Sequence, residues 1–274
     1  MSIVDHIQQI KTQSVGATGA SVLLVEGPND VAAFRIFLSH RPQAAGWERR
    51  WHLEPAGNKR HVLAMLKHEP TWLGIVDRDE WTAAECSAAV QDMPNLVLLP
   101  RFCLESYLVD PHEIWPALGS IQQAKVAGGL PALEQAIAAQ RAHWVRHAAL
   151  WHAINPLWRA LRNQGFKDSV LDPAQPLSDA ELLAVLKGWH NTLDAQAILI
   201  AVQASEAHLL GLQNTELLTQ WVYAKKFYPM VVHAALNQLL GQMAEKDRRL
   251  KLLRHMAQIA VPADLAPLWL AMKV

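Results

Sequence analysis

Acidic side chains follow two apolar runs of the sequence, 21–25 and 72–76, where each run ends. Glu26 follows the first run, and Asp77 and Asp79 follow the second. Carboxylates gathered in one place are the ligands that Mg²⁺ and Mn²⁺ prefer, because these ions bind oxygen and Mg²⁺ keeps several of its waters. Such a site would support metal-assisted hydrolysis of a phosphate ester.

The spacing of Asp77 and Asp79 has two interpretations. Alternate residues of an extended chain share a face, so both carboxylates could approach one cation. An isolated Asp-x-Asp is also common in the turns that follow strands, where aspartate forms local hydrogen bonds. The motif alone therefore does not establish a metal site.

The elements that would position these acids form the pattern of a parallel α/β sheet. Residues 21–115 alternate between short apolar runs and helical patterns, as expected for strands joined by crossover helices. Ligands of such sheets bind at the carboxyl ends of the strands, so we expect the three acids at one edge. The predicted strands are 21–25, 50–54, 72–76 and 96–99, and the predicted helices are 30–39, 58–67 and 82–91.

The residues after Glu26 suit a junction between a strand and a helix. Gly27 permits a tight turn, and Pro28 can begin the next helix. Asp30 is either a further acid of the site or a favourable charge in the first helical turn. Both interpretations stay open.

The strand pattern ends near residue 120, after which Ala, Leu, Gln and Trp dominate. We therefore predict an α/β catalytic domain over residues 1–117 and an all-α domain over residues 118–274. Residues 165–180 are rich in Gly, Pro and Asp and are predicted to form a loop before another helix.

Composition favours a compact globular protein, with 51% hydrophobic and 18% charged residues. Lys plus Arg equals Asp plus Glu at 25 each, so the overall charge does not itself indicate a nucleic-acid partner. Cys86 and Cys103 provide neither a disulfide framework nor zinc-ligand spacing. The first fifteen residues lack the apolar core of a signal peptide, and no apolar stretch approaches the ~20 residues of a bilayer span. We expect a cytoplasmic protein with no membrane association.

The acids together form a more specific pattern than either motif alone. Glu26 is followed by Gly27, and about fifty residues later Asp77-x-Asp79 follows another strand. This pattern resembles the Toprim family, the catalytic domain shared by topoisomerases, bacterial primases and OLD-type nucleases. The resemblance covers residues 20–115. It implies a Toprim-like parallel sheet flanked by helices and cleavage of phosphodiester bonds with Mg²⁺ or Mn²⁺.

A third motif, residues 104–111, is similar to the glutamate segment of the OLD-like branch. The resemblance implies that Glu105 and Asp30 complete a second metal site. In that branch a small polar residue two positions before the glutamate can assist the second metal, which corresponds to Cys103, although the branch has serine there. Cys103 is equally well explained as a small buried residue. Two ions would support two-metal hydrolysis, in which one activates water and the other stabilises the leaving oxygen.

Residues 221–227 resemble the segment that brings a distant lysine to OLD-like sites. Lys225 matches best, although Ala224 stands where the family has glycine, and Lys226 is the alternative. A lysine there would stabilise charge on the phosphate. A solvated lysine pair at a helix start explains the same residues.

Other basic residues are candidate nucleic-acid contacts. Lys59 and Arg60 follow a turn at the same sheet edge and could meet a phosphate directly or through the helix amino terminus. They are equally well explained as surface charges. A denser cluster lies late in the chain and is either a nucleic-acid track or a solvated helix face; it comprises Arg248, Arg249, Lys251 and Arg254.

Within the Toprim families, the turn at 57–59, the Asp77-Arg78-Asp79 motif and residues 105–108 look most like the compact Toprim effectors of PARIS-type phage-defence systems. Those effectors work beside an ATPase of the ABC class. No Gly-x-x-x-x-Gly-Lys-[Ser/Thr] motif occurs in this chain, so such an ATPase would be a separate protein. The resemblance implies a nuclease acting on DNA or RNA, with tRNA among the candidates, and a homodimer is a further candidate assembly.

Two other functions remain open. The chain could be a Toprim-like module that binds nucleic acid or an ATPase without cutting. It could also hydrolyse a phosphoryl group on a small molecule, which the neutral overall charge would suit. The sequence does not distinguish DNA from RNA, because stacking and 2′-hydroxyl contacts would fall on the helical half.

Overall fold

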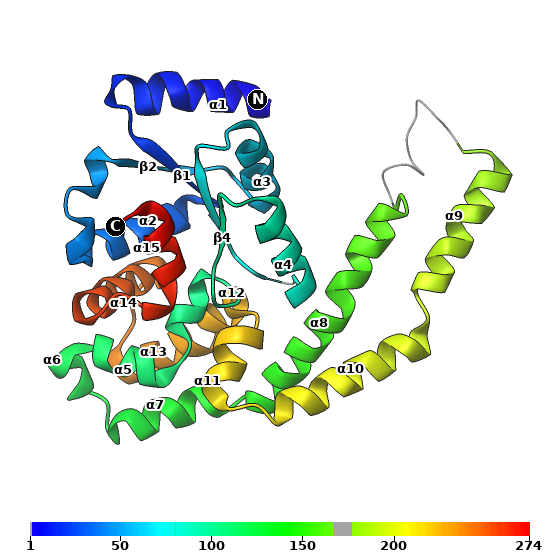
Figure 1. The fold of residues 1–274 in the computed structure, drawn as a ribbon. Helices are drawn as coiled ribbons and strands as arrows, with labels where there is room; N and C mark the ends of the chain where they lie inside the picture. The colour runs from blue at the N-terminus through cyan, green and yellow to red at the C-terminus, as the bar shows by residue number, and fades with distance from the viewer. Residues whose placement is uncertain (1, 80, 167–176) are drawn as a thin grey trace. The chain divides into compact units, whose positions relative to one another are not determined.

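The structure is a computed structural model that describes residues 2–79, 81–166 and 177–274. Its centre is a sheet of four parallel strands in the order β2-β1-β3-β4; Figure 1 shows the sheet with β1, β2 and β4 labelled. The predicted α/β fold with a parallel sheet is thereby confirmed. The strands are β1 (Ser21–Val25), β2 (Trp51–Pro55), β3 (Leu73–Val76) and β4 (Leu96–Leu98).

Crossover helices connect the strands, as the alternating sequence pattern predicts. Each begins with a capping contact: the Asp30 side chain accepts from Gly27 N at the start of α2, the Asn58 side chain accepts from His61 N of α3, and Thr82 forms a capping box with Glu85 in α4. These contacts satisfy amide groups that a helix start leaves unpaired. The three helices are α2 (Pro28–His40), α3 (Lys59–His68) and α4 (Ala83–Asp92).

The sheet is buried on both faces, so its central strands are almost wholly apolar. On one face α1 (Ile3–Gln9) and α3 pack with the sheet in a core that includes Ile7, Val22 and Met65. Helix α3 approaches β3 closely, because a Cβ added at Gly74 would lie 2.9 Å from Val62 Cγ1. Glycine is therefore the residue that fits this position of the strand.

Every regular element described after β4 is helical, in agreement with the sequence. The part of the predicted 165–180 loop that covers residues 167–176 lies outside the described residues. The elements are η5 (Leu104–Leu108), α5 (Pro111–Ala117), α6 (Gly119–Gln123), α7 (Gly129–Ala138), α8 (Arg141–Asn163), α9 (Asp179–Thr192), α10 (Ala195–Leu210), α11 (Asn214–Glu216), η6 (Leu217–Trp221), α12 (Ala224–Phe227), η7 (Tyr228–Val232), α13 (His233–Leu240), α14 (Glu245–Ile259), η8 (Ala263–Leu265) and α15 (Ala266–Met272).

The chain forms two compact units. The first, unit 1, contains the sheet and comprises residues 1–139, 218–220 and 224–274. Helix α14 packs against α2 and α5, and α15 packs against β3 and β4, so the last helices belong to the same unit as the sheet. These two units have other bounds than the predicted domains, 1–117 and 118–274. The predicted domains stay a prediction.

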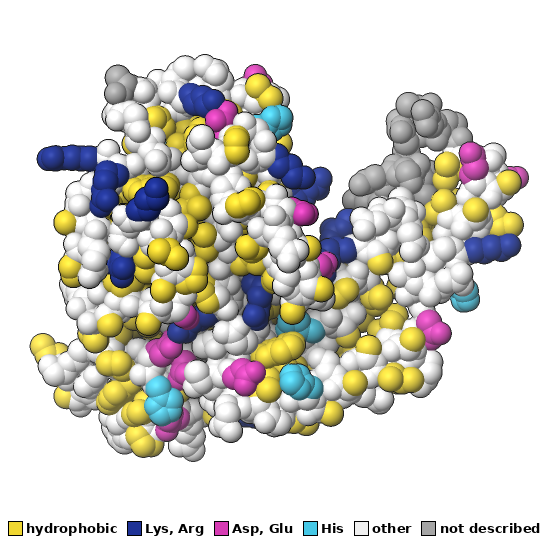
Figure 2. All heavy atoms as spheres, viewed as in Figure 1, with side chains coloured by type: hydrophobic (Ala, Val, Ile, Leu, Met, Phe, Trp, Pro, Cys, Tyr) yellow, Lys and Arg dark blue, Asp and Glu magenta, His cyan; other side chains and the backbone are white. Residues whose placement is uncertain are grey.

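Unit 2 comprises residues 140–217 and 221–223. Its helices α9 and α10 both contact α8. No residue of α9 that the structure describes is buried, and Leu183, Leu199 and Ile200 are exposed. Figure 2 shows apolar side chains spread over the surface of these helices. No helix in the described part of the chain is long and apolar enough to cross a membrane.

Candidate metal centre

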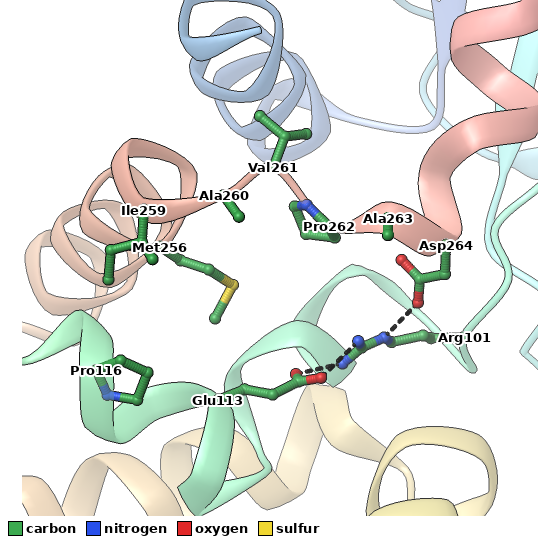
Figure 3. Close-up of a pocket in the computed structure, with 10 residues that line it drawn as sticks. All are labelled: Arg101, Glu113, Pro116, Met256, Ile259, Ala260, Val261, Pro262, Ala263 and Asp264. Carbon is green, nitrogen blue, oxygen red and sulfur yellow. Dashed lines mark hydrogen bonds and ion pairs between the residues drawn. The ribbon is translucent and has the colours of Figure 1, made fainter.

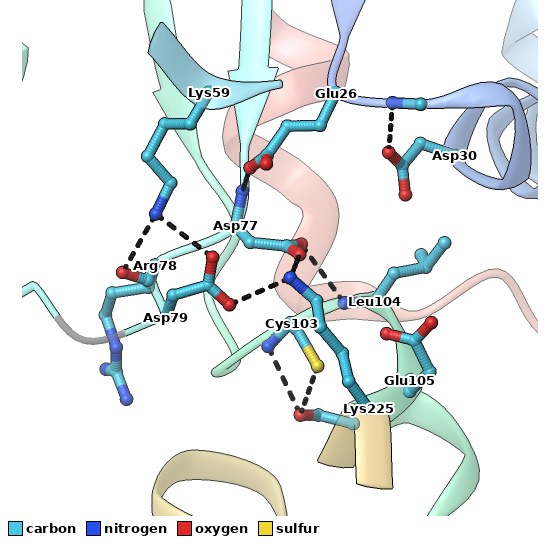
Figure 4. Close-up of polar contacts among 12 residues, drawn as sticks. Glu26, Asp30, Lys59, Asp77, Arg78, Asp79, Cys103, Leu104, Glu105 and Lys225 are labelled. Carbon is cyan, nitrogen blue, oxygen red and sulfur yellow. Dashed lines mark hydrogen bonds and ion pairs between the residues drawn. The ribbon is translucent and has the colours of Figure 1, made fainter. Parts of the chain in front are cut away.

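Glu26 and Asp77 meet at the carboxyl edge of the sheet (Figure 4). Glu26 follows β1 and Asp77 follows β3, and these two parallel strands are neighbours. The Asp77 amide donates a hydrogen bond of 2.8 Å to Glu26 Oε1. The expectation that both acids share one edge is therefore confirmed.

Asp79 joins these acids through a turn. Its φ of 46° lies in the left-handed region, which aspartate tolerates better than most residues. The Asp79 amide donates to Phe102 O at 2.8 Å, which fixes the turn. The sequence predicted that Asp77 and Asp79 share one face of an extended strand. That explanation is wrong, because β3 ends at Val76 and a turn brings the two acids together.

The three carboxylates form one compact group. One oxygen from each of Glu26, Asp77 and Asp79 lies within 4.8 Å of the others. Such a set of oxygen donors suits a hard divalent cation, which takes carboxylates together with water. Among the described residues this is the one group of this kind.

Lys225 reaches the group from α12, as expected from the sequence. Its Nζ lies 2.7 Å from Asp77 Oδ2 and 3.0 Å from Asp79 Oδ1. Burial lowers the pKa of Lys225, but the charges of Asp77 and Asp79 outweigh burial and hold that pKa above its ordinary value. Lys225 therefore stays protonated. The neighbouring Lys226 is exposed.

Lys59 also contacts the acids, at the sheet edge where the sequence places it, and its role as a phosphate contact stays a prediction. Its Nζ lies 3.2 Å from Asp79 Oδ2 and 4.7 Å from the ring centre of Trp81. Its charge is thus directed at a carboxylate. Arg60, the other predicted phosphate contact, is exposed.

Asp30 and Glu105 lie beside the compact group and are not members of it. Asp30 Oδ2 accepts a 2.7 Å hydrogen bond from the Gly27 amide. Burial raises the pKa of Asp30 to about 6, and the charges of Glu105 and Glu26 add to the effect. Asp30 thus lies in the first turn of α2 and bonds to the Gly27 amide there, which confirms one of its two sequence interpretations, while its role as a metal ligand stays a prediction.

Glu105 combines a paired and an unpaired oxygen. Its Oε1 lies 3.3 Å from Arg249 Nη1, while its buried Oε2 has no hydrogen-bond partner in the described part of the chain. An unpaired buried carboxylate oxygen is costly. A bound cation would relieve that cost, which fits the predicted second metal position.

Cys103 contributes packing. The residue is fully buried, and its Sγ lies 3.8 Å from Ser106 Oγ. Burial raises the pKa of the Cys103 thiol well above its ordinary value, and the nearby charges of Glu105 and Asp77 act in the same direction. The thiol is therefore neutral when no cation is bound, and it lies beside the Ser106 hydroxyl.

The acids are electrostatically strained when no cation is bound. Burial raises the pKa of Asp77, the nearby charges of Asp79 and Glu26 raise it further, and Lys225 offsets only part of this. Burial also raises the pKa of Glu26. The three carboxyl groups outnumber the two ammonium groups of Lys59 and Lys225, so a divalent cation would be favoured.

Arg101 links η5, which carries Glu105, to α5 and η8. Figure 3 shows its guanidinium between Glu113 and Asp264. Its guanidinium donates to Glu113 Oε1 at 2.7 Å and to Asp264 Oδ2 at 2.9 Å. It also donates to the carbonyl of Ser106 at 3.2 Å and lies over the ring of Tyr107 at 4.1 Å. The sequence analysis missed this residue, because its partners are up to 163 positions away.

We expect Arg101→Met to lower the free energy of unfolding by about 2 kcal/mol. The substitution keeps much of the apolar stem and leaves partly buried acceptors without their donor. The midpoint of urea unfolding measures the change. Arg60→Met, the same substitution at an exposed position, should alter stability by less than about 0.5 kcal/mol. Equal midpoints for the two variants would contradict the role assigned to Arg101.

The late basic cluster is only partly available to a ligand. Arg248 is 3% exposed and donates to Asn237 Oδ1 and Gly241 O. Arg249 pairs with Glu105. The continuous nucleic-acid track considered for these arginines is therefore not present, because both point to partners within unit 1.

Compared with protein-family models and with curated proteins, the chain matches none of them.

Proposed function

We propose that this protein is a metal-dependent nuclease of the Toprim type, in the OLD-like branch. The observation that carries the proposal is the group formed by Glu26, Asp77 and Asp79, with oxygens within 4.8 Å at the carboxyl edge of a parallel sheet. Lys225, a cation from a remote helix, contacts two of these acids. The combination suits hydrolysis of a phosphodiester bond.

Each residue has a distinct proposed role. Glu26, Asp77 and Asp79 would hold one Mg²⁺ or Mn²⁺, and Asp30 and Glu105 would help to hold a second ion. When bound, the ions supply Lewis-acid stabilisation of the phosphate and an activated water. The Lys225 ammonium would turn from the carboxylates toward the phosphate and stabilise the charge that develops on its oxygens.

The wider function follows from the family resemblance. We propose a cytoplasmic effector that cuts DNA or RNA, with tRNA among the candidates, in phage defence. A separate ABC-type ATPase would be its partner, and a homodimer is a further candidate assembly. Lys59 and Arg60 remain candidate contacts to the nucleic acid.

One observation favours a second candidate, a module that binds nucleic acid or an ATPase without cutting. Lys59 and Lys225 already occupy oxygens of Asp77 and Asp79, so the acids are stabilised in part by internal cations. In this alternative the lysines would stay in place and no metal would bind.

A cleavage assay distinguishes these candidates. Purified protein would be incubated with single-stranded and duplex DNA, with RNA and with nucleotides, in Mg²⁺, in Mn²⁺ or in EDTA, alone and with the partner ATPase. If the protein is a nuclease, we expect shortened nucleic acid in the reactions that contain Mg²⁺ or Mn²⁺ and none in those with EDTA. Release of phosphate from nucleotides with intact nucleic acid would instead indicate a small-molecule hydrolase. No reaction on any substrate, with or without the ATPase, would favour the binding module.

Mn²⁺ and Mg²⁺ are expected to raise the Tm of the wild-type protein. A ligand that binds the folded state adds about 2.7 kcal/mol when its concentration is ~100-fold above Kd, or roughly 5–10 °C for a chain of this size. Differential scanning fluorimetry across a metal titration measures the shift, with Na⁺ at matched ionic strength as the control. A Tm that does not depend on either divalent ion would count against a metal centre.

A further inference from the structure

Unit 2 contains a set of nearly parallel aromatic rings, which we call the aromatic platform: His147, Trp151 and Tyr223. The Trp151 and Tyr223 rings are stacked, with centroids 4.1 Å apart and planes 12° apart. The His147 ring lies 6.3 Å from each, with planes 18° from Trp151 and 13° from Tyr223. The three rings thus share one orientation.

The aromatic platform reaches the protein surface. None of its three residues is fully buried. His147 and Trp151 stand at i and i+4 of α8, so they lie on one face of that helix, and the exposed His143 precedes them by a further four residues. Figure 2 shows histidine side chains at the surface around the first half of α8. Each of the three residues is half-buried, so part of the aromatic platform is open to solvent, while His147 Nδ1 and Trp151 Nε1 are themselves buried.

The aromatic platform offers an uncharged π surface on a basic helix. Burial lowers the pKa of His147, with the charge of His143 acting in the same direction, so the ring is neutral at pH 7. Helix α8 carries four arginines and no acidic residue. One of them, Arg146, pairs with Glu206 of α10 at 2.6 Å. The sequence of α8 thus contributes only positive charge, which is complementary to phosphate.

We propose that the aromatic platform binds a base of single-stranded nucleic acid by stacking, while the arginines of α8 attract its phosphates. Stacking suits every base, because each has a π face, and it requires a base that is not already enclosed in a duplex. Tyr223 stands two residues before Lys225 in the sequence. The inference rests on the proposed nuclease function and deepens it, because it names single-stranded nucleic acid as the form that the protein would bind.

Binding is tested in a background that does not cleave. The Asp77→Asn protein would be titrated into fluorescein-labelled ten-mers of thymidine and of uridine, with anisotropy as the readout. We expect Trp151→Leu and Tyr223→Leu each to weaken binding by about 5- to 100-fold, the range expected for loss of one stacked base. Tyr223→Phe keeps the ring and should bind as the parent does. The two oligonucleotides show whether DNA or RNA is preferred.

Trp189→Leu is the matched control. Trp189 lies in the same unit and packs on Phe166, outside the aromatic platform, so its loss should leave binding unchanged. Circular dichroism would establish that each variant retains its helices. Equal affinity for a duplex, or unchanged binding in folded Trp151→Leu and Tyr223→Leu, would overturn the inference.

The same measurements separate this inference from the nuclease proposal. If both platform variants bind as the parent does and the wild type cleaves, the proposed role of the aromatic platform is wrong and the nuclease proposal stands. If the protein binds single strands through Trp151 but cuts no nucleic acid, the proposed role of the aromatic platform stands and the nuclease proposal is wrong.

Discussion

Asp77→Asn is expected to reduce nucleic-acid cleavage by about 10³-fold while the protein stays folded. Asparagine has nearly the same shape, and its Oδ1 can still accept the hydrogen bond that Asp77 takes from the Leu104 amide at 3.2 Å. The substitution removes the carboxylate oxygen that contacts Lys225 and a strong ligand for a divalent ion. Loss of several kcal/mol of electrostatic stabilisation corresponds to this fall in rate.

Stability without metal provides the second readout for Asp77→Asn. Removing one of the mutually repelling acids offsets the loss of the Lys225 contact, so we expect a metal-free Tm within about 4 °C of the wild type. The increase in Tm on adding Mn²⁺ should shrink sharply. Asp92→Asn, the same substitution at an exposed position, should behave as the wild type does. Wild-type cleavage by Asp77→Asn would show that this acid is not a catalytic ligand.

Lys225→Met should have opposite effects on metal binding and on cleavage. In the structure the Lys225 ammonium occupies oxygens of Asp77 and Asp79 that a metal would also use. Its removal leaves buried carboxylates without that cation, so the metal-free Tm should fall and the increase on adding Mn²⁺ should exceed that of the wild type. Cleavage should fall about 10²- to 10³-fold, because the phosphate loses one charged donor.

Lys226→Met is a closely matched control for this prediction. Lys226 is the next residue and is exposed, so the same substitution should change neither Tm nor cleavage appreciably. Lys225→Arg tests the position of the charge, because a guanidinium is wider and flatter than an ammonium. If Lys225→Met cleaves normally, the lysine serves only as a counter-ion to the acids.

The strands and the principal acids could be predicted because local sequence determines them. An apolar run that ends in Glu26 or Asp77 reports both a buried strand and its carboxyl edge. The observed strands differ from the predicted ones by at most one residue at each end, for example Trp51–Pro55 against 50–54. Parallel pairing then brings the acids together without any further information.

Contacts between distant segments could not be predicted in this way. The left-handed turn at Asp79 depends on a hydrogen bond to Phe102 O. The pairing of Arg249 with Glu105 joins residues 144 positions apart. A basic side chain has the same local pattern whether it is solvated or buried against a remote carboxylate, so the arginines of α14 could not be distinguished from a nucleic-acid track. Lys225 could be placed only through the family resemblance.

The two lysines that neutralise the acids differ in their separation from the acids along the sequence. Lys59 and Asp79 are 20 residues apart, whereas Lys225 and Asp79 are 146 apart. Closing the longer loop costs about 2 kcal/mol more in chain entropy, at ~0.6 kcal/mol for each doubling of length. During synthesis Lys59 precedes Asp79, whereas Lys225 is added only after all three acids. The acids can therefore gain their second ammonium group only when 225 of the 274 residues have been joined.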